Sequence, residues 1–316
     1  MTQQTRPLVS IGIPTYNRAN GHLHAAVQSA AEQTYPNIEI IVSDNCSTDH
    51  TEHLIKSFEY PRIRYFKQET NIGLNNNWNF CLEQAGGDYF LLLHDDDLID
   101  ADFIEACMTA VNDDTSVGII RTGTRSIDDD GNVRGEGPNL AGGLSTRDFF
   151  LAWLERRSGP HNICSTLYNT RALKDIGGFW SKTNLYQAEV AAAKLAASHG
   201  RADVKTVKAS FRKHTGTYGS AARISDWCDD SLYLLEVMCS LVPTEREALW
   251  RTGMRYFSRA NYNRASRTKP ASQRFKAYLT VYRKFQYSFS PLEFMYFRLS
   301  RRLKHRGKHR VTATSV

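Results

Sequence analysis

Three adjacent carboxylates, Asp95, Asp96 and Asp97, follow the apolar run YFLLL. At neutral pH adjacent carboxylates repel one another, and burying them without a partner is costly. Side-by-side oxygen ligands suit a divalent cation such as Mg²⁺ or Mn²⁺, which takes its remaining ligands from water and phosphates. The alternative is an acidic helix start, which the helix dipole favours, and we prefer it for Asp100 and Asp102. For the three aspartates, the sequence favours a metal or nucleotide site.

Polar residues also end two earlier apolar runs, LVSIGIP (8–14) and IEIIVSDN (38–45). The first hundred residues alternate such runs with helical patterns, which indicates a parallel sheet covered on both faces. We expect strands at 8–14, 38–45, 63–66, 88–95 and 116–120, and helices at 22–33, 50–58, 74–85 and 101–111. Because ligands bind at the carboxyl ends of parallel strands, the three polar clusters should converge on one site.

The remainder of the chain gives weaker patterns. Residues 121–144 are rich in Gly and Asp and indicate turns with an antiparallel hairpin. TRDFFLAWLER is helical, 163–169 is a strand, and 183–200 is a helix that Gly200 closes. From about residue 225 onward we expect only helices.

The composition is that of a soluble globular protein, with 316 residues, 41% hydrophobic and 23% charged. We see no signal peptide and no apolar run of the roughly 20 residues that span a membrane, so we expect a cytoplasmic protein. Six scattered cysteines form no CxxC pair, which favours reduced thiols. No GxGxxG, GxxxxGK[ST] or GxSxG motif is present, so dinucleotide-binding, P-loop and α/β-hydrolase proteins lack their signatures.

The motifs PLVSIGIPTYNR, EIIVSDNCSTD, NIGLNNNWNFCLEQAGGDYFLLLHDDDL and LYNTRALKDIGGF follow one another over residues 7–200. In this order and spacing the chain resembles family 2 glycosyltransferases of the GT-A fold. The resemblance implies an α/β fold, a Rossmann-like mostly parallel sheet flanked by helices, followed by a helical C-terminal region. It implies a catalytic domain at 1–220, with a nucleotide-sugar half (1–115) and an acceptor half (116–220), and then a basic helical region at 221–316.

The resemblance also implies an activity. Such an enzyme moves a sugar from a nucleotide diphosphate sugar to an acceptor hydroxyl, with inversion at the anomeric carbon and with Mn²⁺ or Mg²⁺. A UDP- or dTDP-sugar is the favoured donor, and a glycan or lipid-linked molecule is the acceptor, in surface polysaccharide or glycan assembly. The processive branch carries a QxxRW motif and membrane spans, and this sequence has neither, so we expect a non-processive hexosyltransferase.

The family's donor site maps onto the strand ends and the segment before residue 78. Its donor-binding residues are implied to be Pro14, Thr15, Tyr16, Arg18, Asp44, Asn45, Asn71, Asn77, Asp95 and Asp96. The DxD motif falls on Asp95 and Asp97, with Asp97 as the direct metal ligand and Asp95 as the second. A register shifted by one would instead use His94 and Asp96. Where the family often has Arg-Asn, this chain has Asn76-Asn77, so Arg18 or another residue would supply the basic contact, and Asn71 and Asn77 are pocket residues or structural caps.

The family's catalytic base is a carboxylate, often in a Glu-Asp pair, that opens the helix after a Gly-Gly-Phe turn. Here the pair falls on Ala188 and Glu189, so the first acid is absent and the second is Glu. Glu189 is implied as the base, and a solvated helix glutamate is the alternative. Acceptor binding is implied for nearby aromatic and histidine side chains, each of which could equally belong to the core: Trp153, His161, Trp180 and Tyr186.

The charge is unevenly distributed. From Arg251 to Val316 there are 17 Lys and Arg residues but a single acid, a net charge of +16, whereas residues 1–250 carry −9. Basic residues mixed with large apolar ones over 270–310 suit an anionic membrane surface, so we expect peripheral attachment at the inner face of the membrane. A helical cap with a solvated tail is the alternative, and nucleic acid is disfavoured because no binding motif accompanies the charge.

Two other functions compete with transfer. A catalytically silent nucleotide-sugar binding protein would explain the missing acid before Glu189. A nucleotidyltransferase is disfavoured, because IPTYNRANG lacks a Gly-rich basic loop after the first strand.

Overall fold

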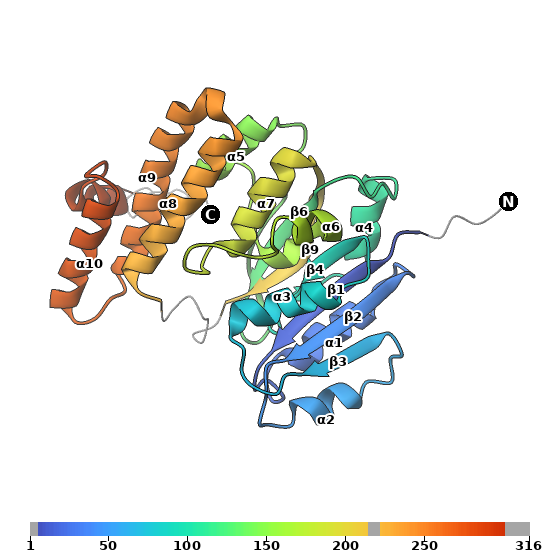
Figure 1. Ribbon diagram of the computed structural model, residues 1–316. Coiled ribbons are helices and arrows are strands. Elements are labelled where there is room, and N and C mark those ends of the chain that lie inside the picture. The colour runs from blue at the N-terminus through green and yellow to red at the C-terminus, as the bar shows by residue number, and fades with distance from the viewer. Residues whose placement is uncertain (1–5, 214–221, 301–316) are drawn as a thin grey trace, which may run out of the picture. The chain divides into compact units, whose positions relative to one another are not determined.

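The computed structural model describes residues 6–213 and 222–300. The chain divides into two compact units, residues 1–220 and 221–316. Figure 1 shows a twisted sheet with helices on both faces in the first unit, and helices alone among the labelled elements of the second.

Within the described residues of the first unit, nine strands form one sheet, in the order β3-β2-β1-β4-β8-β6-β9-β5, with β7 paired to β6. They are β1 (Val9–Thr15), β2 (Ile38–Asp44), β3 (Ile63–Lys67), β4 (Tyr89–Leu92), β5 (Leu98–Ile99), β6 (Ile119–Ile127), β7 (Val133–Gly137), β8 (Thr166–Asn169) and β9 (Arg201–Arg212).

The sheet changes character at β4. Strands β3, β2, β1 and β4 are parallel neighbours, with Ile11 opposite both Ile40 and Leu91. Beyond them β8 is antiparallel to both β4 and β6, while β9 is parallel to β6. The predicted α/β sheet flanked by helices is confirmed, and the parallel arrangement holds for its first half. That half is parallel because each strand returns through a helix to the same edge.

The helical elements of the first unit cover the two faces of the sheet. They are α1 (Leu23–Ala31), α2 (Thr51–Lys56), α3 (Leu74–Gln84), α4 (Phe103–Ala110), α5 (Thr146–Leu154), η1 (Ile163–Ser165), α6 (Thr170–Asp175) and α7 (Gln187–Ser198). On one face α1 and α4 pack on an aliphatic core that includes Ile11, Ile40 and Leu91. On the other, α3 approaches β1 so closely that a Cβ at Gly12 would lie 2.8 Å from Cys81 Cβ.

Most predicted elements are found within a few residues of their expected positions. The hairpin expected in 121–144 is the antiparallel pair β6–β7, and the strand expected at 163–169 begins with the 3₁₀ turn η1. Three elements were not predicted: β5, α6 and the twelve-residue strand β9. The sequence of β9, RADVKTVKASFR, is mostly polar, and only its last residues are buried, so it lacks the apolar run of a central strand.

The second unit is helical over its described residues, as expected. Its helices are α8 (Ile224–Leu241), the short η3 (Pro243–Glu245), α9 (Arg246–Ala265), α10 (Ala271–Lys284) and a further helical stretch at 291–300. Leu235, Phe257, Tyr262 and Phe294 are buried among them. In the part of the chain that the structure describes, no helix combines the length and apolar character needed to cross a membrane.

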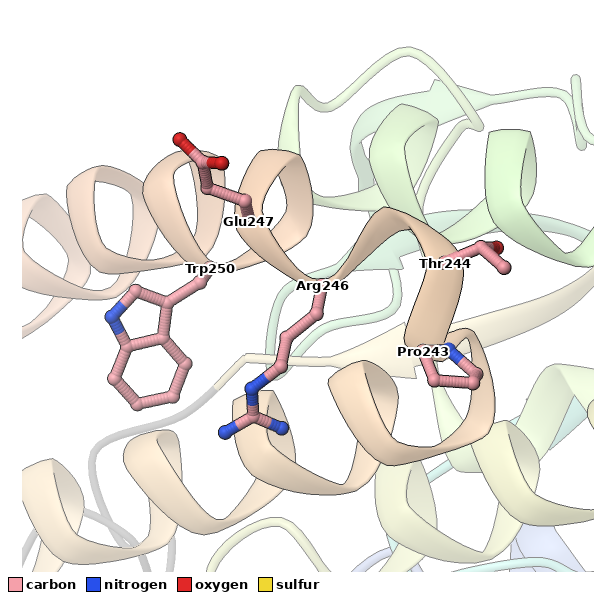
Figure 2. Close-up of a pocket in the computed structure, with 5 residues that line it drawn as sticks. All are labelled: Pro243, Thr244, Arg246, Glu247 and Trp250. Atoms are coloured by element: carbon pink, nitrogen blue, oxygen red, sulfur yellow. The ribbon is translucent and has the colours of Figure 1, made fainter.

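A shallow pocket lies where η3 meets α9 (Figure 2). It is lined by Pro243, Thr244, Arg246, Glu247 and Trp250. The Arg246 guanidinium lies over the Trp250 ring, 5.8 Å from its centroid, and bonds to a carboxylate of α8 at 2.8 Å. None of the predicted site residues lies in this pocket.

Candidate functional site

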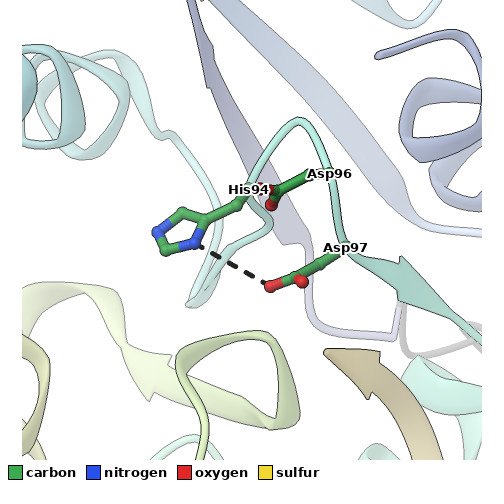
Figure 3. A group of neighbouring side chains, drawn as sticks. All are labelled: His94, Asp96 and Asp97. Carbon is green, nitrogen blue, oxygen red and sulfur yellow. Dashed lines mark ion pairs between the residues drawn. The ribbon is translucent and has the colours of Figure 1, made fainter. Parts of the chain in front are cut away.

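The turn after β4 gathers His94, Asp96 and Asp97 (Figure 3). Each offers one ligand atom, and these atoms lie within 4.8 Å of one another. His94 Nδ1 lies 3.8 Å from Asp97 Oδ2. Among the described residues, neither Asp97 Oδ2 nor His94 Nε2 has a hydrogen-bond partner, although both atoms are buried. A divalent cation would satisfy the unused carboxylate oxygen, so these residues fit the predicted metal.

Asp97 is the most enclosed of the three, with its side chain fully buried. Its Oδ1 accepts a hydrogen bond from the Arg212 backbone N–H at 2.9 Å, at the end of β9. Burial, followed by the negative charge of Asp96, raises the pKa of Asp97 well above its usual value. Burial likewise lowers the pKa of His94. Both shifts disfavour ionisation of Asp97 and His94 in the absence of a cation, and a cation at Asp97 would favour its ionised form.

Asp95 points elsewhere. Its Oδ2 accepts a hydrogen bond from Thr15 Oγ1 at 2.7 Å, and it lies outside the group of His94, Asp96 and Asp97. Burial raises the pKa of Asp95 to about 6, against the lowering effects of Thr15 and of the Arg18 charge. The structure therefore places the Asp95 carboxylate against the end of β1, outside the group of His94, Asp96 and Asp97.

The three predicted strand ends do lie together. The Asn45 N–H donates to Thr15 O at 2.9 Å, which joins the ends of β2 and β1. Thr15 in turn reaches Asp95 after β4. Pro14 is buried within β1, while Tyr16 is 46% exposed just beyond it. The carboxyl edge of the parallel strands thus brings the expected polar groups to one place.

Asp44 is the last residue of β2 at this edge and is fully buried. Its Oδ2 accepts from the Tyr65 hydroxyl at 2.6 Å, and its Oδ1 accepts from the Ser47 backbone N–H at 2.8 Å. Asn45 Nδ2 donates to Asn71 Oδ1 at 2.9 Å. These hydrogen bonds fix the shape of the edge, and Tyr65, which had not been predicted, holds the Asp44 carboxylate in place.

Asn77 is committed to the fold. Its Oδ1 accepts from Ser43 Oγ at 2.6 Å, and its Nδ2 donates to Ser43 O at 3.0 Å, deep between α3 and β2. The asparagine is 3% exposed. These two hydrogen bonds use both polar atoms of the Asn77 side chain and join α3 to β2.

Arg212 is a second residue that had not been predicted. Its Nε donates to Asp96 O at 2.8 Å, and its Nη1 donates to Asp128 O at 2.7 Å and to Asp129 O at 2.9 Å. Together with its backbone bond to Asp97, it ties the end of β9 to the acidic turn. The only signal in the sequence was an arginine in a strand that itself had not been recognised.

Glu189 stands in the first turn of α7 and is partly buried. Its neighbour Tyr168 donates to Ala188 O at 3.4 Å, and burial followed by the Glu189 charge raises the pKa of Tyr168. An aromatic row connects this region to the acidic turn. Ring centroids are 5.3 Å apart between Tyr168 and Phe179, and 6.0 Å between Phe179 and Trp78.

The row ends at the acidic turn, where the Trp78 and His94 rings are 4.8 Å apart. Phe179 is held in it by Asn79, which accepts from its N–H at 2.8 Å and donates to its carbonyl at 3.0 Å. One packed row of rings therefore runs from Tyr168, which senses the charge of Glu189, to the candidate metal ligand His94.

The four predicted acceptor residues fall in two groups. Trp153 on α5 lies 4.8 Å from the His161 ring, which precedes η1. Trp180, 51% exposed, and Tyr186 belong to the segment that leads into α7, just before Glu189.

Comparison with known proteins identifies the family. Residues 10–175 match the family model described as Glycosyl transferase family 2. The chain belongs to this family. The resemblance seen in the motifs is thereby confirmed, and the family is one of transferase enzymes. The match includes the three strand ends and the acidic turn, but it stops before α7 and Glu189.

Several glycosyltransferases are similar over part of their length. The chain is 33% identical to a chondroitin synthase of Escherichia coli over 42% of this chain and 19% of that protein. It is 40% identical to an uncharacterized glycosyltransferase of Rickettsia felis over 55% of this chain and 29% of that protein. A Campylobacter jejuni GalNAc(5)-diNAcBac-PP-undecaprenol beta-1,3-glucosyltransferase is 31% identical over 46% of this chain and 48% of that protein. The chain thus spans less than half the length of these three relatives.

Solved structures share the fold. TarS of S. aureus, residues 1–349 in complex with UDP-GlcNAc, has a TM-score of 0.66 at 17% identity, covering 88% of this chain and 81% of that one. The mannosyltransferase PcManGT of Pyrobaculum calidifontis, with GDP-Man and Mn²⁺, has a TM-score of 0.54 at 18% identity, covering 87% and 75%. These similarities confirm the predicted GT-A type fold of this family 2 member.

Proposed function

We propose that the protein is a metal-dependent, inverting glycosyltransferase that moves a sugar from a nucleotide diphosphate sugar to an acceptor hydroxyl. One observation carries this proposal: the buried Asp97 Oδ2, which has no hydrogen-bond partner among the described residues, is grouped with His94 and Asp96 at the edge where β1 and β2 also end. In this arrangement the chain's first unit is the catalytic domain, with residues 1–115 binding the donor and 116–220 the acceptor.

The donor would lie along the strand ends. Tyr16 is exposed enough to stack on a base, and Arg18 lies close enough to Asp95 for its charge to lower the pKa of that carboxyl. Asp97, with His94 and Asp96, would hold the cation, and Mn²⁺ or Mg²⁺ there supplies stabilisation of the negative charge on the leaving diphosphate. Asp95 would face the donor ribose from the Thr15 side.

Glu189 would act as the general base. A carboxylate that takes the proton from the acceptor hydroxyl, on the side of the sugar ring opposite the leaving diphosphate, leads to inversion. Trp180 and Tyr186 precede Glu189 in the chain and offer aromatic faces to a sugar acceptor. The partly buried position of Glu189 beside Tyr168 supports this role over that of a solvated helix glutamate.

The relatives suggest the substrates. TarS was solved with UDP-GlcNAc, which supports a UDP-sugar or the closely similar dTDP-sugar as donor. The name of the Campylobacter relative describes a glucosyltransferase with an undecaprenol-linked substrate, which supports a glycan or lipid-linked acceptor. Surface polysaccharide or glycan assembly is the corresponding setting.

Thermal unfolding tests the donor site. UDP, dTDP, GDP, CDP and ADP are each added with and without Mn²⁺ to wild type and to Asp97→Asn, with the exposed Asp130→Asn as matched control. A nucleotide at 100 times its dissociation constant adds about 2.7 kcal/mol to the free energy of unfolding, which raises the unfolding temperature by roughly 5–10 °C. We expect a rise that needs Mn²⁺, persists in Asp130→Asn and disappears in Asp97→Asn. No rise with any nucleotide would refute the proposal, and a rise without sugar transfer would favour the silent binding protein.

We further propose that the second unit, residues 221–316, attaches to an anionic membrane surface, which places the protein at the cytoplasmic face. In the helical stretch 291–300, Leu292, Met295, Tyr296 and Leu299 are spaced i, i+3, i+4 and i+7 and are 50–76% exposed. The following ten residues contain six Lys and Arg. An apolar helix face beside a basic run matches the chemistry of anionic lipid.

Liposome flotation tests the attachment. Wild type should float with vesicles that contain phosphatidylglycerol and should float less as salt is raised. Leu292→Ser/Leu299→Ser should lose flotation, whereas Tyr287→Ser, which removes an exposed aromatic residue outside the stripe, should keep it. Equal flotation of all three proteins, or none with wild type, would contradict the proposal.

A further inference from the structure

A second cluster of polar side chains with unused hydrogen-bonding capacity lies on the sheet face that carries Tyr168. Arg121 of β6 is fully buried, and among the described residues its Nε and Nη1 have no hydrogen-bond partner. Its Nη2 makes a single long contact, to Pro160 O at 3.5 Å. His161 follows Pro160, and within the described part of the chain neither of its buried ring nitrogens has a hydrogen-bond partner. Buried polar groups are rarely left in this state.

The local charge is positive. Asp203 is the acid nearest to Arg121, with Asp203 Oδ1 3.9 Å from Arg121 Nη1. The same carboxylate already lies 2.9 Å from Arg201 Nε and accepts from Asn139 Nδ2 at 2.8 Å. Two guanidinium groups thus share one carboxylate. Burial lowers the pKa of Arg121 to about 10, despite the opposing charge of Asp203.

Aromatic side chains wall the cluster. Both guanidinium groups lie over the Phe149 ring, whose centroid is 5.0 Å from Arg121 Cζ and 4.4 Å from Arg201 Cζ. The Trp153 ring lies next to it, with its centroid 5.8 Å from that of Phe149 and 4.8 Å from that of His161. Trp153 and His161 are both partly exposed, although the two ring nitrogens of His161 are buried.

The cluster adjoins the proposed reaction centre. Arg121 is the register partner of Thr166 on β8, and Ile119 is that of Tyr168, so Arg121 and Tyr168 lie on the same face of the sheet. Both Glu189 and Arg121 are near enough to Tyr168 for their charges to shift its pKa. A group held at Arg121 would therefore belong to a molecule that approaches Glu189.

We infer that Arg121 and His161, walled by Phe149 and Trp153, form a subsite for an anionic group, a carboxylate or a phosphate, of the acceptor. An anion would accept from the unused Arg121 Nε–H and Nη1–H and from a His161 N–H, and it would balance the excess positive charge. Aromatic walls would pack on the sugar or polyol that bears the anion. This inference rests on the proposed function for the word acceptor, whereas anion binding itself does not.

Ligand-dependent thermal unfolding at pH 7 tests the subsite directly. Glucuronate is compared with glucose, and glycerol 3-phosphate with glycerol, so that each pair differs in its anionic group. With an anion at ten times its dissociation constant, we expect a rise of roughly 3–5 °C over its neutral counterpart. A rise with glucuronate indicates a uronic acid acceptor, and one with glycerol 3-phosphate indicates a phosphate-bearing acceptor. Because many anions stabilise proteins without binding a site, the difference between wild type and variant is the measured quantity.

Arg121→Gln should lose the anion-specific rise. The control is Arg125→Gln on the same strand, whose guanidinium is already paired with Asp100 at 2.8 and 2.9 Å and which should keep the rise. If Arg121→Gln does not fold, His161→Phe, which keeps an aromatic ring but removes both nitrogens, takes its place and should weaken anion binding several-fold.

The outcomes separate the two proposals. Equal rises in wild type and both variants, or no rise in wild type, would overturn the subsite, and water alone would then satisfy Arg121. That result would leave the response to nucleotide and Mn²⁺ untouched. An anion-specific rise without any nucleotide response would instead support the subsite and refute the donor site. Additive rises with nucleotide and anion together would show that the two ligands occupy different sites.

Discussion

Replacing Asp95 by Asn should make the metal-free protein more stable at neutral pH. In the folded chain burial raises the pKa of Asp95 to about 6, compared with 3.8 for an unperturbed aspartate. The folded state therefore holds this proton more tightly than the unfolded state. The stability that the protonated Asp95 contributes is complete below pH 3.8 and is lost as the pH rises through 6. About two pKa units correspond to a loss of up to about 3 kcal/mol.

Asparagine suits this test because its amide oxygen can still accept the hydrogen bond from Thr15 Oγ1 that the carboxylate accepts at 2.7 Å. The substitution thus removes the titration while it keeps the hydrogen bond from Thr15. Urea unfolding in EDTA would be measured at pH 4.5 and pH 7.5 for wild type, Asp95→Asn and the exposed control Asp130→Asn. The stability of Asp95→Asn relative to wild type should increase by about 2 kcal/mol between the two pH values.

A relative stability of Asp95→Asn that does not change with pH would refute this reasoning, because it would mean that Asp95 titrates alike in the folded and unfolded states. If Asp95→Asn is less stable than wild type by the same amount at both pH values, the hydrogen bond from Thr15, rather than the buried charge, dominates the stability of this position. The Asp130→Asn control should follow wild type at both values.

Three further predictions concern other residues of the first unit. Glu189→Gln should lower kcat by a factor of about 10²–10⁴ while nucleotide affinity is kept; full activity in a transfer assay would remove Glu189 from the base role. Gly178→Ala should lower the free energy of unfolding in urea by about 2–4 kcal/mol, because φ is +75° and the new Cβ would collide with Asn79 of α3. Gly177→Ala, at φ +86° with open space around it, should lower it by only about 1 kcal/mol. Equal losses of stability in the two variants would contradict the packing argument. Tyr65→Phe should destabilise the protein by about 1–3 kcal/mol and weaken nucleotide binding, because it leaves Asp44 Oδ2 without its hydroxyl donor; unchanged thermal and nucleotide-dependent melting would show that this bond is dispensable.

The convergence of the strand ends could be predicted because it follows from topology alone. Apolar runs such as VSIGIPT and YFLL are long enough to identify buried strands, and helices between them impose parallel order. Parallel order then brings Thr15, Asp44 and the acidic turn to one edge, whatever the details of packing. The hydrogen bond between Thr15 and Asp95 is a direct result of that order.

The membership of the acidic group could not be predicted in the same way. Asp95 and Asp97 are two residues apart, yet Asp95 faces β1 while Asp97 lies with His94, because the backbone turns sharply once β4 has ended. Arg212, which fixes that turn, comes from a strand with a mostly polar pattern and two register irregularities against β6. Such a contact between residues 115 positions apart leaves no local signal.

The two clusters on the first unit differ in what they need to be stable. At Asp97 the cost of burial falls on a carboxyl group that can remain protonated, so the chain tolerates the site without a cation and gains stability when one binds. At Arg121 the buried group remains charged, because even a pKa of about 10 leaves it protonated at neutral pH. A proton can therefore substitute for the cation at the first cluster, whereas only an anion or water can satisfy the second. Rising pH should accordingly strengthen cation binding at the acidic turn while anion binding at Arg121 changes little, apart from the contribution of His161.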